Sequence, residues 1–157
     1  RQALGNQYSS WEEAKADILG LYMVCSLIDK GEITSITKED AVTTFIAGIL
    51  RSVRFGAASA HGVANMMCFN FFEDNQAFSK NAEEIYTINY ENAFKTIDSW
   101  AAMILEVEGT GDIVRAENYS KKNGQIRPSL QETLDVINGK NIPKDIRYEQ
   151  GKKVLGL

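Results

Sequence analysis

The sequence predicts a mostly α-helical protein, an irregular multi-helix domain with at most one small β-hairpin. Apolar residues recur at the helical period of about 3.6 residues in several segments. Ser, Thr, Pro or Gly stands where these segments begin or end. The chain has 157 residues, of which 44% are hydrophobic and 24% charged, enough for one domain with a core. We therefore expect residues 1–157 to form a single helical domain.

The first expected helix begins at the Ser-Ser pair 9–10 and runs to about Lys30, where Gly31 stops it. Either serine can cap it, with Glu12 or Glu13 closing a capping box three residues later. Beyond Ile18, apolar residues occur on nearly all sides of this helix, which predicts burial on several sides. Its apolar stripe comprises Trp11, Ala14, Ile18, Leu21, Tyr22, Cys25 and Ile28.

Five more helices are expected further along the chain. The first of them is capped by Thr37, with Asp40 at the third position of a capping box. Alternation around Ile85 and Ile88 predicts a short strand or hairpin. The tail after residue 139 is less regular. The expected helices span residues 38–56, 58–78, 91–109, 111–122 and 128–139.

Charge and cysteine content exclude several classes of partner. The formal net charge is -4 and the Lys-Lys pair 121–122 stands alone, so we expect no nucleic-acid partner. Cys25 and Cys68 lie in apolar surroundings, which favours two buried thiols over a disulfide. The apolar run 18–28 is too short to cross a membrane, and no signal peptide is visible. We expect a cytoplasmic location, with an earlier targeting segment left open because the chain starts at Arg1.

Three acids, Glu12, Glu13 and Asp17, lie near the start of the first expected helix. Glu13 and Asp17 share one face, and Glu12 lies about 100° away around the helix. One interpretation is capping and a favourable helix dipole in the first turn, with Lys15 balancing the charge. The other is a zinc site, in which a Glu from a second helix is the third ligand and an acid one turn later orients a ligand histidine. The spacing alone favours the first interpretation.

His61 is the single histidine of the chain and lies in an apolar helical segment. Such a histidine is most often a core or boundary residue, but it can also donate to a developing oxyanion or act as an acid or base. Gly56 and Gly62 flank it and allow close approach of a backbone or a substrate. No serine nucleophile motif is present, and Cys-His catalysis stays open. With one histidine and no HExxH or HExxGH, the chain can supply only part of a zinc site of that type.

Two segments together resemble a known family. "EEAKAD" (residues 12–17) resembles the second conserved motif of the M49 metallopeptidases, the dipeptidyl peptidase III family. "AHGVAN" around His61 resembles that family's downstream Ala-His segment. The resemblance covers about residues 9–72 and is closest to the branch that in plants is fused to a Nudix domain. It implies that Glu13 is the third zinc ligand, that Glu12 and Asp17 support the ligand histidines, and that His61 stabilises the transition state of peptide hydrolysis.

The chain departs from the family pattern in two places. Asn65 stands where the dipeptidyl peptidases usually carry Arg, which leaves the substrate specificity open. The HExxGH helix, which brings two zinc ligands and the general-base Glu, lies upstream in the family and is absent here. The resemblance therefore implies the C-terminal part of the zinc-bearing catalytic lobe of a longer protein. Its partners would be a peptide substrate and the rest of the parent chain, Zn²⁺ would be bound only together with that rest, and the isolated chain would be inactive.

An alternative function comes from a different class. The chain could be a non-catalytic helical binding module, or a degenerate relative that keeps the fold without zinc. The sequence before Ser9 distinguishes the two hypotheses. An HExxGH about 30 to 60 residues upstream favours the peptidase, and its absence favours the module.

Overall fold

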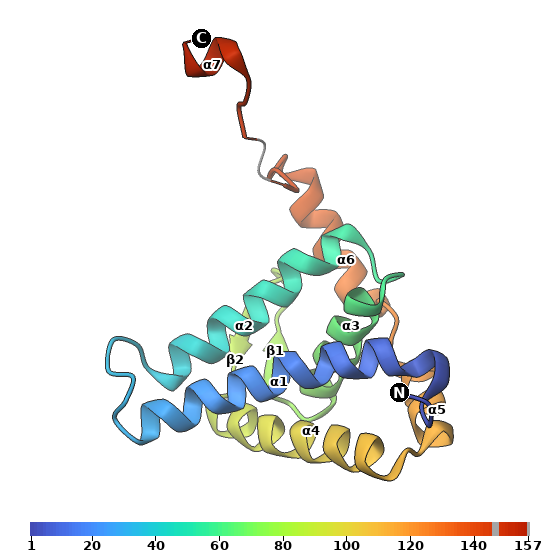
Figure 1. Cartoon of the computed structure of the whole chain (residues 1–157). Helices are drawn as coiled ribbons and strands as arrows, with labels where there is room; N and C mark the ends of the chain where they lie inside the picture. The colour runs from blue at the N-terminus through green and yellow to red at the C-terminus, as the bar shows by residue number, and fades with distance from the viewer. Residues whose placement is uncertain (146–147, 157) are drawn as a thin grey trace.

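The computed structural model describes residues 1–145 and 148–156 and is mostly helical, with one small hairpin, as the sequence predicts. Two single-turn 3-10 helices, η1 (Gly5–Gln7) and η2 (Val53–Phe55), precede α1 and follow α2. Figure 1 shows the path of the chain. The α-helices are α1 (Tyr8–Asp29), α2 (Lys38–Ser52), α3 (Ala60–Asp74), α4 (Tyr90–Thr110), α5 (Ile113–Asn123), α6 (Pro128–Gly139) and α7 (Lys152–Leu155).

The strands β1 (Phe78–Lys80) and β2 (Tyr86–Ile88) form an antiparallel pair in which Phe78 lies opposite Ile88. This pair confirms the hairpin expected around residues 85–88. Phe78 also packs on Phe69 of α3, with ring centroids 4.7 Å apart. The hairpin therefore continues the core beyond the C-terminal end of α3.

The core lies where α1 crosses α3 between α2 and α4 (Figure 1). Trp100 of α4 is its centre, with ring centroids 6.1 Å from Trp11, 4.8 Å from Phe71 and 5.3 Å from Tyr119. The Nε1 atom of Trp11 donates a hydrogen bond of 3.0 Å to Ser120 Oγ. These contacts join α1, α3, α4 and α5, and so fix the first turns of α1 relative to α3.

The start of α1 differs from the prediction. The helix begins at Tyr8, directly after η1, and its N-cap residue Gln7 makes no side-chain capping bond. Ser10 lies inside the helix and its hydroxyl donates to the Gln7 carbonyl at 3.1 Å. Glu12 and Glu13 therefore lie beyond the first turn, which contains no acidic residue. The predicted capping box of α1 is wrong, because η1 runs straight into the helix and α1 starts at Tyr8, before the two serines.

Other helix ends follow their sequence signals more closely. The capping box of Thr37 and Asp40 at the start of α2 is confirmed. Gly31 adopts a φ of 74° just after α1, as expected for a glycine that ends a helix. Helix α4 continues through Gly109 to Thr110, and the left-handed residue is Gly111, with a φ of 68°.

The second half of α1 is more exposed than its sequence predicts. Ile18 and Leu21 are buried, but Tyr22, Met23 and Leu27 are 44%, 59% and 37% exposed. Helices α2, α3 and α4 cover only part of the circumference of α1 (Figure 1). The predicted burial on several sides is therefore wrong for the chain as it stands.

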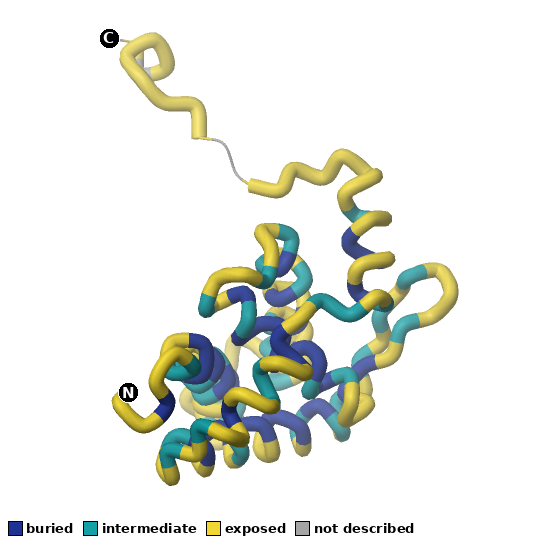
Figure 2. The backbone as a smooth tube through the Cα atoms, turned by 90° about the vertical axis from the view of Figure 1, so that its right-hand side faces the viewer, coloured by how far each residue is buried: buried dark blue, intermediate teal, exposed yellow. Residues whose placement is uncertain are grey.

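Exposed residues also dominate the chain beyond α6. Figure 2 shows that residues 140–145 and 148–154 are exposed.

Cys68 is buried and Cys25 is partly buried, and both are free thiols, as predicted. Among residues 1–145 and 148–156, no helix combines the length and apolar character needed to cross a lipid bilayer.

Candidate functional site

The structure brings Glu13 of α1 and His61 of α3 together. His61 Nδ1 lies 3.3 Å from Glu13 Oε2, so the carboxylate accepts a hydrogen bond when Nδ1 carries the proton. Both side chains are about half exposed, at 51% and 49%. The two residues are 48 positions apart in the sequence, and the packing of α1 on α3 joins them. A solvent-facing pair of an acid and an imidazole is thus built on two rigid helices.

His61 is placed by a tight turn before α3. Ser59 caps the helix, its hydroxyl accepting from the Gly62 amide at 3.0 Å. Gly56 has a φ of 100°, which favours glycine over other residues. A Cβ atom on Gly62 would lie 2.7 Å from the Gly56 carbonyl oxygen and 2.8 Å from the Ala57 Cα. The sequence correctly indicates close approach at these glycines, and the approaching group is backbone.

We expect Gly62→Ala to lower the free energy of unfolding by about 1–3 kcal/mol, because the new methyl group meets backbone atoms that cannot rotate away. The measurement is urea unfolding of the chain. Gly48→Ala is the matched control, since Gly48 lies inside α2 with open space at its Cβ position. Alanine should stabilise α2 there by up to about 1 kcal/mol. Equal stability of the two variants would contradict the account.

Asp17 lies one helical turn after Glu13 and next to the same pair. Its pKa is raised above the ordinary value, first by burial; the His61 charge lowers it and the Glu13 charge raises it. Within the part of the chain that the structure describes, no hydrogen-bond donor contacts the Asp17 carboxylate. Asp17 is therefore a half-buried acid close to Glu13 and His61, and its carboxylate accepts no hydrogen bond from the described residues.

A pH dependence follows from the raised pKa of Asp17. The pKa of the Asp17 carboxyl is higher in the folded than in the unfolded state. The free energy of unfolding therefore falls as the pH rises from the ordinary pKa of 3.8 through the folded-state pKa. We expect Asp17→Asn to stabilise the isolated chain at neutral pH and to be almost neutral near about pH 4. Urea unfolding of both proteins from about pH 4 to about pH 7 measures the difference. A variant that is less stable than the wild type at neutral pH would refute this reasoning.

Glu12 makes a different contact from the other two acids. Lys15 Nζ lies 2.6 Å from Glu12 Oε2 and 2.6 Å from Glu108 Oε2. These two partners raise the pKa of Lys15. Lys15 thereby links α1 to α4, and Glu12 lies in this ion-pair group apart from the contact between Glu13 and His61. The sequence suggested a charge-balancing role for Lys15 but gave no signal for Glu108, which is 93 residues away.

Two further residues of α3, Asn65 and Cys68, are buried. Asn65 is 4% exposed, and its Nδ2 atom donates to Ser52 Oγ at 2.8 Å. Its amide thus joins α3 to the end of α2. Burial raises the pKa of the Cys68 thiol, and the charge of Asp17 raises it further. Cys68 therefore stays protonated, which is unfavourable for a nucleophile.

Glu13 and Asp17 offer carboxylate oxygens, which are one of the donor types that zinc accepts. Zinc in proteins takes imidazole nitrogens and carboxylate oxygens, usually three or four of them from the protein. Within residues 1–145 and 148–156, no group of three or more His, Cys, Asp or Glu side chains is close enough to hold a metal. Glu13 is half exposed and Asp17 accepts no hydrogen bond from the described residues, so both carboxylates can interact with groups outside them. These residues fit zinc only together with ligands from another segment.

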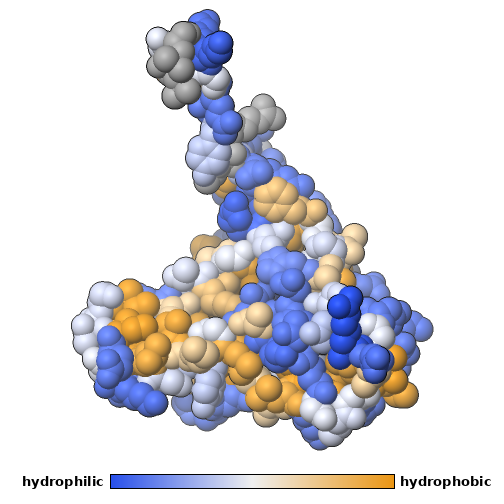
Figure 3. Space-filling view, in the orientation of Figure 1, coloured by the Kyte–Doolittle hydropathy of each residue, from blue (hydrophilic) through white to orange (hydrophobic). Residues whose placement is uncertain are grey.

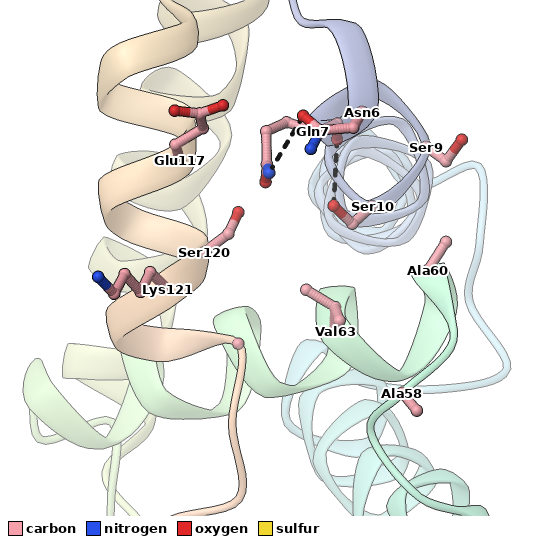
Figure 4. A pocket seen from close by; sticks show the side chains of 11 residues that line it. Asn6, Gln7, Ser9, Ser10, Ala58, Ala60, Val63, Glu117, Ser120 and Lys121 are labelled. Atoms are coloured by element: carbon pink, nitrogen blue, oxygen red, sulfur yellow. Dashed lines mark hydrogen bonds between the residues drawn. The ribbon is translucent and has the colours of Figure 1, made fainter.

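A pocket of about 580 Å³ with both polar and apolar lining residues includes Ser9 and Ala60, which are close in sequence to Glu13 and His61 (Figure 4). It lies between the start of α1, the start of α3 and α5, and the sequence gave no signal for it because three distant segments form it. Ser9 is one helical turn before Glu13, and Ala60 directly precedes His61. Its lining includes Asn6, Gln7, Ser9, Ser10, Ala58, Ala60, Val63, Glu117, Ser120, Lys121 and Gly124.

Comparisons with known proteins identify relatives of this chain. No protein-family profile matches it. It is 32% identical over 146 residues to the protein named Nudix hydrolase 3 of Arabidopsis thaliana, covering 93% of this chain and 19% of that protein. Two solved structures share its fold. These are dipeptidyl peptidase III from Caldithrix abyssi (TM-score 0.86, 29% identity) and from Corallococcus sp. strain EGB (TM-score 0.87, 36% identity). They align over 92% and 94% of this chain, which spans 28% and 27% of their own lengths.

The fold is therefore that of one region of the dipeptidyl peptidase III structures. The resemblance of this chain to the dipeptidyl peptidase III family, peptidase family M49, is confirmed. The match to Nudix hydrolase 3 agrees with the predicted relation to the plant branch.

Proposed function

We propose that this chain forms the C-terminal part of the catalytic region of a zinc-dependent peptidase that hydrolyses short peptides. We call the longer polypeptide required by this proposal the parent protein. Glu13 acts as the third zinc ligand, Glu12 and Asp17 support the two ligand histidines of an upstream HExxGH segment, and His61 stabilises the transition state. Zn²⁺ would be held only when that segment is present.

The observation that carries the proposal is the 3.3 Å contact between His61 and Glu13. The two segments that resemble the family lie 48 residues apart, and the fold brings their proposed functional residues to one solvent-facing point. The raised pKa of Asp17 adds support, since such carboxyls gather at functional sites. The similarity to dipeptidyl peptidase III structures supports the same class of reaction.

Bound zinc would polarise the scissile carbonyl and activate a water molecule. The residues of this chain would then act around that centre. His61 is a donor at both ring nitrogens when protonated, so Nδ1 can stay bonded to Glu13 while Nε2 donates to the oxyanion. The contact with Glu13 fixes the orientation of the ring before the substrate arrives. The pocket lined by Ala60 also offers hydroxyl and amide groups, and there we place part of the peptide main chain.

The experiment that tests the proposal is hydrolysis of a set of short peptides by the purified parent protein, with and without a zinc chelator. The proposal predicts cleavage that the chelator abolishes and added Zn²⁺ restores. The isolated chain should show no cleavage. A parent protein whose sequence lacks HExxGH, and which cleaves none of the peptides with or without the chelator, would favour the alternative of a non-catalytic helical module. The buried Asn65, whose amide joins two helices, is the feature that suits such a degenerate relative.

A further inference from the structure

An ion-pair group joins the first half of α1 to the last turn of α4. Lys15 Nζ lies 2.6 Å from Glu12 Oε2 and 2.6 Å from Glu108 Oε2. Figure 3 shows hydrophilic side chains over this half of α1, whereas hydrophobic ones gather over its second half. In Figure 1, α4 runs beside α1 in the opposite direction, which brings the end of α4 next to the start of α1. Lys15 thus has one carboxylate partner on its own helix and one on another.

Glu108 is the more deeply buried of the two partners of Lys15. Its side chain is 14% exposed, compared with 40% for Glu12. The core holds α4 on α1 next to this group, through the Trp11 and Trp100 rings, whose centroids are 6.1 Å apart. An exposed ion pair between neighbouring turns of one helix is weak by itself, because two long side chains must be held in one geometry. Glu108 therefore anchors the Lys15 ammonium, and the ammonium in turn holds Glu12.

The Glu108 carboxylate is not arranged for stability alone. Its Oε1 atom is buried and has no hydrogen-bond partner within the part of the chain that the structure describes. A buried carboxylate with an unpartnered oxygen costs free energy, and an apolar side chain of similar volume is often at least as stabilising. What the carboxylate does provide is a fixed position for the Lys15 ammonium.

Lys15 holds only one of the two carboxylate oxygens of Glu12. The hydrogen bond goes to Oε2, and Oε1 accepts none from residues 1–145 and 148–156. The partial exposure of the side chain leaves this second oxygen open to groups outside the described residues. A carboxylate that is already held at one oxygen loses little conformational freedom when an imidazole N–H donates to the other. Such a carboxylate is suited to orient a metal-binding histidine.

We propose that Glu108 is a positioning residue for the zinc site of the parent protein. Through Lys15 it fixes the Glu12 carboxylate, so that the free oxygen is ready to accept from a ligand histidine. The inference rests on the proposed function, because Glu12 supports such a histidine only if the upstream segment binds zinc. It adds a residue of α4, 93 positions from Lys15, to a site whose other residues in this chain lie on α1 and α3.

The test is a double-mutant cycle of zinc affinity in the parent protein, with Glu12→Ala and Glu108→Leu made singly and together. Competition with a fluorescent zinc chelator measures the affinity. We expect Glu108→Leu alone to lower it by about 10-fold, the lower end of the range for loss of a direct outer partner. In the Glu12→Ala background, the same change should alter the affinity by less than about 2-fold, because Glu108 acts only through Glu12.

Two further variants support the cycle. Glu108→Gln keeps an oxygen that can accept from Lys15, so it should recover part of the affinity that Glu108→Leu loses. It also serves as the second variant if the leucine protein does not fold. Glu106→Gln is the matched control, because Glu106 also lies near the end of α4 and pairs with Arg115 at 2.8 Å. Its zinc affinity should equal that of the wild type.

An unchanged zinc affinity in both Glu108 variants would overturn the inference and leave the proposed function standing. Equal losses in the wild-type and Glu12→Ala backgrounds would also overturn it, because Glu108 would then act on the site without Glu12. A wild-type parent protein that binds no zinc would refute the proposed function, and the inference would fall with it.

Discussion

Replacing Glu13 with alanine is expected to remove most of the zinc from the parent protein. The variant loses a carboxylate ligand, and each remaining ligand must hold the ion without it. We expect the zinc affinity to fall by more than the roughly 10- to 100-fold that loss of an outer hydrogen-bond partner costs. Peptide hydrolysis should fall with the zinc content. Elemental analysis after dialysis, together with a zinc titration of activity, measures both effects.

Glu32→Ala is the matched control for this experiment, because it removes the same charge from an exposed position between α1 and α2. Its zinc content and activity should equal those of the wild type. Glu13→Gln keeps the size of the side chain and removes its charge, so it should lose zinc as Glu13→Ala does. Unchanged zinc in either Glu13 variant would exclude Glu13 as a ligand.

Replacing His61 with alanine is expected to lower kcat by about 10²-fold or more while zinc content stays unchanged. The predicted loss is that of one hydrogen-bond donor to a developing oxyanion. Because the interaction forms only in the transition state, KM should change little. Stability should also change little, since His61 is half exposed in the first turn of α3.

His61→Gln refines this prediction, since its amide keeps one donor and should recover part of the lost rate. Steady-state kinetics of the three proteins, each with its metal content measured, gives the comparison. A fall in zinc content in His61→Ala would mean that the imidazole binds or orients the metal. A kcat that is unchanged at full zinc content would remove His61 from the mechanism.

The sequence predicts most helices of this fold from local signals. Thr37 and Asp40, three residues apart, specify their capping box without help from the rest of the chain. The start of α1 is different, since the turn η1 decides it and the serines at 9–10 end up inside the helix. Local capping rules therefore misplace Glu13, and only the correct start of the helix removes the first-turn explanation for the acids.

The candidate site is predictable only in part, for a related reason. Glu13 and Asp17 share a helix face by spacing alone, but the contact with His61 depends on how α1 packs on α3. The bond of Lys15 to Glu108 joins residues 93 positions apart and separates Glu12 from the other acids. Contacts between distant segments have no signal in a short stretch of sequence. The apolar second half of α1 shows the same limit, because its hydrophobic sequence predicts burial while Tyr22, Met23 and Leu27 are exposed in the structure.

The most direct test of the central claim is a crystal structure of the parent protein with zinc located by anomalous scattering. The account predicts one zinc ion about 2.0–2.2 Å from a carboxylate oxygen of Glu13, with two imidazole nitrogens of an upstream segment as further ligands. His61 should lie beside the ion without binding it. A zinc ion bound elsewhere, or a fully occupied site in which Glu13 takes no part, would contradict the account.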